Sequence, residues 1–215
     1  EVNVDGTGFR QVLMPPSDET DLVRRYANGY HHGTDDMSPC YLPDGGICFV
    51  STRCQYGTLC DNPDCFTTTT LFRMDADGKN LRQLSTSALS EQTPTMAEDG
   101  NILYSRWEYV DKGAVSVKCL WSMYPDGSGS REVYGADIAL PPTMTQGRAI
   151  PGVPGGYVVM GVPHFPQMGV GTVIRLDMNK PIRTREPMTY MTPYTDIRGE
   201  GGFEFMDANG KWFGD

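Results

Sequence analysis

Three features of the 215-residue sequence predict an all-β fold, and in particular a β-propeller with four-stranded blades. Two short phrases recur along the chain, and each carries a turn glycine between strand-like segments. One of these phrases recurs with a constant spacing. Glycine and proline are frequent, with 25 and 16 residues, and no segment keeps the 3.6-residue apolar period of a long helix.

The first phrase combines alternating apolar residues with an Asp-Gly turn and a basic residue. It reads EVNVDGTGFRQV at residues 1–12, LFRMDADGKNLRQLS at 71–85 and LWSMYPDGSGSREVYG at 120–135. A less similar copy, VIRLDMNKPI at 173–182, has Asn179 at the turn position, where we expect it to replace glycine at positive φ. Alternation followed by such a turn is typical of a β-hairpin.

The second phrase is regular in its spacing. It reads SPCYLPDGGICFVSTR at 38–53 and TPTMAEDGNILYSRWE at 93–108. Its turn glycines are 55 residues apart, and the same step leads to two further turns: Gly45, Gly100, Gly155 and Gly210. A period near 50 with two hairpins per unit is typical of propellers. We therefore expect a repeat of about 55 residues in which the second phrase forms the inner strand pair of each blade and the first phrase forms the outer pair.

The repeat predicts a single propeller region across the whole chain. Because both ends of the sequence fall inside a phrase, we expect a fragment of a larger propeller. The alternative is that residues 1–12 and 203–215 combine as one blade and close a four-bladed ring. One short helix is expected in a loop, at 18–27. The expected segments are the end of one blade with a loop at 1–35, blades at 36–90, 91–140 and 141–200, and the start of the next blade at 201–215.

Charge and motif content exclude several classes of function. The net charge of -9 and the pI of about 4.8 leave no basic stripe for nucleic acid. No run of 18 apolar residues is present, so we expect no transmembrane segment. The hydrolase and nucleotide motifs GxSxG, HExxH and the phosphate loop are absent. The sequence therefore identifies no catalytic residue and leaves open whether the protein is an enzyme.

Cysteines carry the most specific chemical signal. A two-residue turn at Asp44-Gly45 would pair Tyr41 with Cys48 and place Cys40 on the opposite face, so we expect no bond between Cys40 and Cys48. The other three cysteines of this region have spacings that fit a loop disulfide, a thiolate metal site or free buried thiols. Five of the six cysteines fall within 26 residues: Cys40, Cys48, Cys54, Cys60 and Cys65.

The three histidines are candidates for metal or catalytic chemistry. His31 and His32 precede Asp35 and Asp36 in a segment that is either a polar loop or part of a metal site. Neighbouring residues of a strand point to opposite faces, so at most one of these two imidazoles can join a given carboxylate. His164 follows the apolar segment GYVVMGVP in a loop rich in proline and glycine. Loops at strand ends are common positions for functional residues.

The phrases DMSPCYLPDGGICFVSTRC, TLFRMDADGKNLRQLS, SEQTPTMAEDGNILYSRWEYVDKG and LWSMYPDGSG resemble the TolB-like propeller repeat. More closely they resemble the middle, propeller domain of the hydrazine synthase alpha subunit family. The resemblance covers the whole chain and is strongest at 36–127. It implies one module of a larger exported bacterial protein, in the periplasm or otherwise outside the cytoplasm, with neighbouring domains or subunits as partners.

The resemblance also implies a metal and haem environment. In that family the propeller contributes Cys and His ligands to a metal ion, with zinc as the candidate here, beside a haem. The matching residues are Cys54 and His164. Met168 stands where the family has a tyrosine that ligates the haem iron, and methionine is also a haem ligand. This departure puts a hydrazine-forming activity in doubt. No CxxCH motif is present, so a haem c would be held by another part of the protein.

The alternative function is a TolB-like propeller that binds a protein or a glycan and has no catalytic activity. Loop aromatics would then form the contact surface: Tyr56, Trp107, Tyr109 and Phe165. Trp107 and Trp121 lie within strand phrases, however, and for them packing between blades is the competing explanation.

Overall fold

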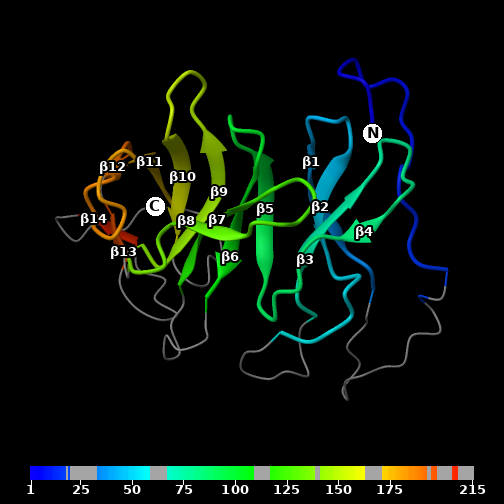
Figure 1. The fold of residues 1–215 in the computed structure, drawn as a ribbon, viewed down its shortest axis with the longest axis horizontal. Coiled ribbons are helices and arrows are strands. Elements are labelled where there is room, and N and C mark those ends of the chain that lie inside the picture. The colour runs from blue at the N-terminus through cyan, green and yellow to red at the C-terminus, as the bar shows by residue number, and fades with distance from the viewer. Residues whose placement is uncertain are drawn as a thin grey trace.

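A computed structural model describes residues 1–17, 19, 33–58, 67–108, 117–138, 141–162 and 171–192, together with the backbone of 195–197 and 205–207. Regular structure in this part of the chain consists of β-strands (Figure 1), which confirms the all-β prediction. The helix expected at 18–27 falls outside the described residues, except for Glu19. In the described part, no helix is long and apolar enough to cross a membrane.

The strands form three successive antiparallel units of four strands and a final pair. The first unit contains β1 (Asp36–Tyr41), β2 (Ile47–Ser51), β3 (Thr70–Met74) and β4 (Arg82–Gln83). The second contains β5 (Glu91–Met96), β6 (Ile102–Trp107), β7 (Lys118–Met123) and β8 (Arg131–Tyr134). The third contains β9 (Thr143–Ala149), β10 (Gly156–Val162), β11 (Thr172–Asp177) and β12 (Met188–Tyr190). The final pair is β13 (Thr195–Ile197) and β14 (Phe205–Asp207).

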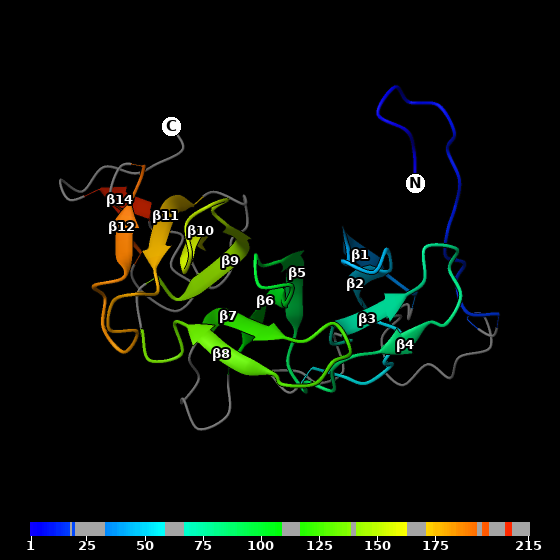
Figure 2. The same cartoon turned by 45° about the horizontal axis from the view of Figure 1, so that its top comes forward.

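The units are arranged with their first strands together. β1 contacts β5, and β5 contacts β9, while the fourth strands β4, β8 and β12 lie at the periphery (Figure 2). One parallel bridge between Lys118 and Thr143 joins the second and third units into a single hydrogen-bonded sheet. The second phrase therefore forms the inner strand pair of the first two units, and the first phrase forms their outer pair.

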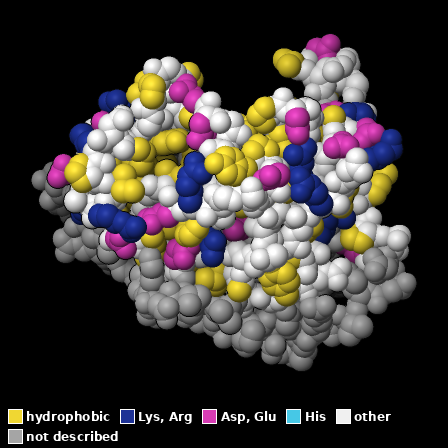
Figure 3. Space-filling model, in the orientation of Figure 1, with side chains coloured by type: hydrophobic (Ala, Val, Ile, Leu, Met, Phe, Trp, Pro, Cys, Tyr) yellow, Lys and Arg dark blue, Asp and Glu magenta, His cyan; other side chains and the backbone are white. Residues whose placement is uncertain are grey.

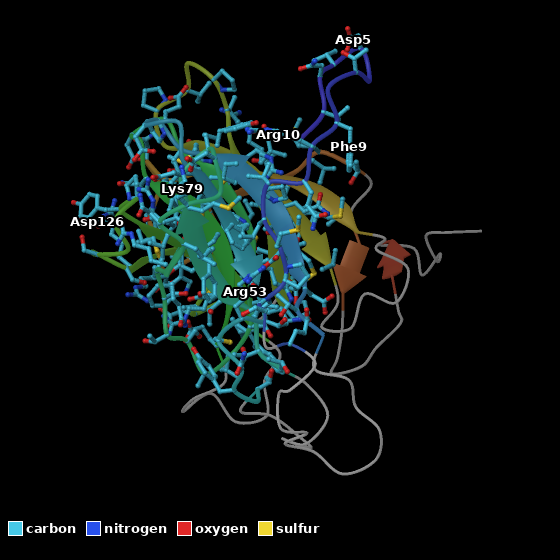
Figure 4. The ribbon with its side chains drawn as sticks, turned by 90° about the vertical axis from the view of Figure 1, so that its right-hand side faces the viewer. Asp5, Phe9, Arg10, Arg53, Lys79 and Asp126 are labelled. Carbon is cyan, nitrogen blue, oxygen red and sulfur yellow. The ribbon has the colours of Figure 1, made fainter. Side chains whose placement is uncertain are left out.

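The turn of the first phrase has the same geometry in its three copies. In the first copy the Asn3 amide donates to the Thr7 carbonyl at 2.9 Å and the Gly6 amide donates to the Asn3 carbonyl at 2.8 Å. The corresponding bonds recur at Asp75 and at Tyr124. The glycines adopt φ values of 82°, 83° and 93°: Gly6, Gly78 and Gly127. Residues 1–12 thus form a hairpin turn of the repeat, although this arm pairs with none of the described strands. Its tip at Asp5 projects away from the strands (Figure 4).

Asn179 does not replace glycine as expected. It lies in the turn after β11, but Asn179 is not among the residues with positive φ. Its backbone amide instead donates to Asp177 Oδ1 at 3.1 Å. An aspartate that accepts the amide two residues on stabilises a turn without a left-handed residue, so the prediction of positive φ at Asn179 is wrong.

The register of the first hairpin also differs from the prediction. Tyr41 pairs with Ile47, and Cys40 pairs with Cys48. The Leu42 amide donates to the Gly46 carbonyl at 2.8 Å, which leaves a three-residue loop that ends with a left-handed glycine, a common hairpin connection. The extra loop residue shifts the pairing of the two strands by one residue. After such a shift, two side chains that were predicted on opposite faces lie on the same face of the hairpin. Cys40 and Cys48 therefore lie opposite one another rather than on different faces.

Each first strand contains a bulge with a left-handed residue. The ladder is irregular between Met37 and Cys40, between Gln92 and Thr95, and opposite the 158–160 segment of β10. The non-glycine residues at these bulges have φ values of 52°, 49° and 53°: Ser38, Thr93 and Gln146. The Gln146 amide donates to Thr93 Oγ1 at 3.2 Å, so the bulges of β5 and β9 contact each other.

The core consists of three apolar clusters that follow the strand alternation. Cys48 and Val50 of β2 face a cluster that includes Ile102 of the second unit. Ile47 and Phe49 face the other side of the first unit. Because both faces of β2 are covered, all of its residues are buried. The third cluster lies between the second and third units and includes Leu103, Leu120, Val159 and Ile174.

Candidate functional site

Cys54, the metal ligand that the family resemblance implies in the described part, lies just after β2. Its thiol donates to the Thr68 carbonyl oxygen at 3.3 Å, and the side chain packs against the cluster that contains Phe49 and Phe72. Burial raises the pKa of the Cys54 thiol, so the free side chain is protonated at neutral pH. Cys54 is a free cysteine and forms no disulfide with Cys40.

Of the other residues named for a metal or haem site, Asp35 and Asp36 are described. The rest lie outside the described residues: His31, His32, Cys60, Cys65, His164 and Met168. Within the described residues, no three His, Cys, Asp or Glu side chains gather closely enough to hold a metal ion. The pairing of Cys54 with His164 therefore stays a prediction.

Asp36 has a structural role at the end of the first hairpin. Arg53 donates to both carboxylate oxygens, from Nε at 2.9 Å and from Nη2 at 2.7 Å, and Ser51 Oγ donates at 2.7 Å. Bidentate pairs of this kind fix geometry. Arg53 Nη2 also donates to the Met14 carbonyl at 2.8 Å, so this ion pair links β1, the segment after β2 and the N-terminal arm.

The aromatic residues that the sequence offered as a contact surface are engaged inside the protein. Lys118 Nζ lies 5.3 Å from the centroid of the Trp107 ring, and the Arg106 guanidinium lies 4.4 Å from that of Trp121. The Tyr56 hydroxyl accepts a long bond from Gln83 Nε2 at 3.4 Å. Trp121 also packs against the cluster between the first and second units, so packing between blades explains Trp121. Tyr109 and Phe165 lie outside the described residues.

A polar cavity between the first and second units is a site that the sequence did not predict. Its volume is about 230 Å³. Hydroxyl, carboxyl and guanidinium groups line it together with a few apolar side chains: Leu84, Ser85, Thr86, Ser87, Glu91, Arg106, Met123, Gly127 and Ser130. A polar cavity of this size has room for small polar molecules or water.

Glu91 is the central residue of this polar cavity. It is the first residue of β5 and is only 1% exposed. Its Oε2 accepts hydrogen bonds from the Ser85 hydroxyl and, at 3.3 Å, from the Leu71 amide. Burial raises the pKa of Glu91 to about 7, and the Ser85 bond and the charge of Arg106 oppose that rise. Glu91 therefore changes its protonation state near neutral pH.

Arg106 supplies the positive charge beside this carboxyl group. It is paired with Glu91 in the β5–β6 ladder, stacks on Trp121, and its Nε lies 3.2 Å from Glu108 Oε1. Ser130 also lines the polar cavity, and its hydroxyl lies 2.8 Å from that of Tyr104. The arrangement can bind a small polar group and exchange a proton with it.

One sequence signal could have identified Glu91. It follows Asp36 by 55 residues, the period of the turn glycines, and both residues begin the first strand of a unit. The 55-residue spacing alone therefore indicates that the two acids occupy equivalent positions in the repeat. Their different burial depends on which sheet lies beside each of them.

Comparison with known proteins places the chain by its fold. No protein-family model and no curated protein matches the sequence. Among solved structures, hydrazine synthase from Kuenenia stuttgartiensis matches with a TM-score of 0.59 and 20% identity over 89% of this chain. A puromycin hydrolase matches with a TM-score of 0.50 and 16% identity over 89% of this chain. TolB from Acinetobacter baumannii has a TM-score of 0.46 and 14% identity over 74% of this chain.

The likeness to hydrazine synthase confirms, at the level of fold, the resemblance that the sequence predicts. The chain is similar to part of each protein only: it spans 29% of the hydrazine synthase chain, 26% of the puromycin hydrolase and 32% of TolB. Identities this low carry no information about activity. The chain therefore has a propeller-like architecture of four-stranded units.

Proposed function

We propose that the chain is the propeller scaffold of an exported, hydrazine-synthase-alpha-like redox protein, and that Cys54 and His164 supply ligands to a metal ion beside a haem. The fold likeness to hydrazine synthase over 89% of the chain carries this proposal. The scaffold would position the metal-binding loops and dock the domains or subunits around it.

The order of the strands supports a shared position for the two ligands. Cys54 follows β2, and His164 follows β10, and each is the second strand of its unit. β7 runs parallel to β9, while β6 and β10 run antiparallel to them. β6 and β10 therefore have the same direction, and we expect the equivalent β2 to share it. The loops that follow these strands would then leave the sheets at one rim.

The chemistry of Cys54 fits a metal ligand in part. Thiolate sulfur and imidazole nitrogen are the donors that zinc prefers. Cys54 is a protonated thiol in its own environment, so metal binding would release its proton. The described residues do not complete a coordination set. A haem would be bound by another part of the protein, with Met168 of this chain as a ligand to its iron.

A cobalt substitution experiment on the intact protein tests the ligand pair. Co²⁺ bound to a thiolate gives a sulfur-to-metal charge-transfer band. We expect this band in the wild type, its loss in Cys54→Ala, and a weaker affinity in His164→Ala. Cys40→Ala is the matched control, because Cys40 is likewise free and partly buried, and it should keep the band. A band that survives Cys54→Ala would contradict the proposal and favour a protein- or glycan-binding propeller.

A second proposal concerns the size of the propeller. We infer that residues 1–12 are the outer hairpin of a further blade in a larger propeller. Their turn has the bonds of the other outer hairpins, and a groove of about 460 Å³ separates the arm from the first unit. Apolar residues of both sides line the groove, including Phe9, Val12, Met37 and Ile47, and yellow side chains reach the surface beside the projecting arm (Figure 3). The inner strand pair of that blade would fill the groove.

The exposure of Phe9 gives a test of this arrangement. Phe9 is 81% exposed in the described part, whereas Val4 on the same arm is fully exposed at the tip. In the protein as isolated from its source, Phe9→Ser should lower the free energy of unfolding by about 2 kcal/mol if a strand pair covers the ring. Val4→Ser should change it little. Equal and small effects of both substitutions would contradict an occupied groove.

A further inference from the structure

Cys40 and Cys48 face each other across the first hairpin. They are directly opposed in the β1–β2 ladder, and both are free cysteines. Cys48 belongs to the cluster between the first and second units, and Cys40 packs against the same cluster. Each thiol also shifts the pKa of the other. Directly opposed residues of an antiparallel pair have Cα atoms about 4.5 to 5.5 Å apart, which lies within the range that a disulfide spans.

We propose that Cys40 and Cys48 are a redox-active pair that forms a cross-strand disulfide by exchange with an external disulfide. The bond would covalently fasten the innermost strand of the first unit to its neighbour. The external oxidant belongs to the class of small-molecule disulfides or disulfide oxidoreductases.

The burial of the two side chains sets the order of the exchange. Cys48 is 0% exposed and lies in the cluster between the first and second units, with Val50 and Leu71. Cys40 is only partly buried. The neighbouring Cys48 thiol lowers the pKa of Cys40, burial opposes this shift and the charge of Arg148 adds to it. The neighbouring Cys40 thiol and burial both raise the pKa of Cys48. Cys40 is therefore both the more accessible sulfur and the better nucleophile.

The exchange proceeds in two balanced steps. The Cys40 thiolate attacks one sulfur of the oxidant, which gives a mixed disulfide and releases the first thiol of the oxidant. Cys48 then gives up its proton, attacks Cys40 Sγ and expels the second thiol. In total the two cysteines lose two electrons and two protons, and the oxidant is reduced from a disulfide to two thiols.

The other two cysteines of the described part, Cys54 and Cys119, provide internal comparisons. The Cys54 thiol donates to the Thr68 carbonyl, and Cys119 Sγ accepts a bond from Trp121 Nε1 at 3.2 Å. Neither has a cysteine opposite it in the ladders of the described strands. We therefore expect only Cys40 and Cys48 to be oxidised as a pair within this part of the chain.

Redox titration with peptide mapping tests the pair without any substitution. The native protein is equilibrated in glutathione buffers of increasing oxidising strength, quenched, alkylated after denaturation and digested. We expect Cys40 and Cys48 to lose reactivity together at one midpoint, in a peptide lighter by two hydrogens. Cys119 should remain alkylated throughout. Cys40 and Cys48 that stay alkylated in the most oxidising buffer, or that carry separate glutathione adducts, would overturn the proposal.

A variant and a stability measurement add a second test. In Cys40→Ser, Cys48 should remain reduced in every buffer, because the nucleophile that begins the exchange is missing. The oxidised wild type should also melt several degrees above the reduced wild type, since a cross-link restricts the unfolded chain. Identical melting of the two forms, or oxidation of Cys48 with a partner other than Cys40, would contradict a native cross-strand disulfide.

Discussion

Asp36 and Glu91 occupy equivalent positions in successive units but lie in opposite environments. Each begins the first strand of its unit, and 55 residues separate them. The Asp36 side chain is 28% exposed and is held by Arg53. Glu91 is 1% exposed and bonds the Leu71 amide and the Ser85 hydroxyl.

The difference follows from the origin of the partners. Ser51 and Arg53, which bind Asp36, belong to the same unit as Asp36. Leu71 and Ser85, which bind Glu91, belong to the preceding unit. An acid at this position therefore connects two units where a sheet precedes it, and the preceding sheet also buries it. The repeat determines the position of the acid, and the neighbouring sheet determines its pKa.

The largest expected effect comes from neutralising Glu91. The pKa of Glu91 in the folded protein, about 7, is above the ordinary value of 4.5. The folded state therefore holds a proton that the unfolded chain releases between these two values. The stability contributed by the protonated carboxyl is complete below pH 4.5 and is lost as the pH rises to 7. We expect a loss of about 3 kcal/mol over that range.

Glu91→Gln removes this titration and keeps the shape of the side chain. Measured by urea unfolding, the stability difference between the variant and the wild type should change by about 3 kcal/mol in favour of the variant from pH 4 to pH 8. Asp36→Asn is the matched control, and it should not stabilise the protein at pH 8. Parallel pH profiles of the wild type and Glu91→Gln would show that Glu91 is not buried as described.

A smaller effect is expected from Ser85→Ala. The Ser85 hydroxyl donates to the Glu91 carboxylate, and its removal leaves an acceptor in a buried site. We expect a loss of about 1 to 2 kcal/mol at pH 8 and a further rise in the pKa of Glu91, which ¹³C NMR of labelled glutamate would detect. Ser87→Ala, at another hydroxyl of the polar cavity, should leave that pKa unchanged; an equal shift from both variants would argue against a direct bond.

The smallest effect is expected for the ion pair between Asp36 and Arg53. A double-mutant cycle with Asp36→Asn and Arg53→Met should give a coupling energy of about 0.5 to 1 kcal/mol, because the carboxylate is partly exposed to solvent. Unfolding at low and high salt should show the coupling weaken with ionic strength. A coupling energy near zero would show that the ion pair does not contribute to the free energy of unfolding.

Local patterns in the sequence were sufficient to predict the hairpin strands and the glycine turns between them. The Asp-Gly turns and the spacing of Gly45 and Gly100 predicted the hairpins, because a left-handed glycine leaves a short-range signature. The register at Cys40 and Cys48 was missed, because the segment LPDGG permits loops of two or three residues and only the ladder distinguishes them.

Non-local contacts explain the rest. The burial of Glu91 depends on Leu71 and Ser85 of the preceding unit. The sequence around Glu91 contains no pattern that predicts these contacts. Cys54 was placed by family resemblance, and its bond to the Thr68 carbonyl depends on the return of the chain before β3. The proposed second ligand, His164, belongs to a distant repeat of the sequence, so only the family resemblance could suggest it.

Metal analysis combined with an absorption spectrum, on the protein isolated from its native source, tests the proposed function most directly. We expect bound metal together with a haem absorption band, and we expect Cys54→Ala or His164→Ala to remove the metal while the propeller stays folded. A metal-free, colourless protein that is unaffected by both substitutions would contradict the proposal and leave a propeller that only binds partners.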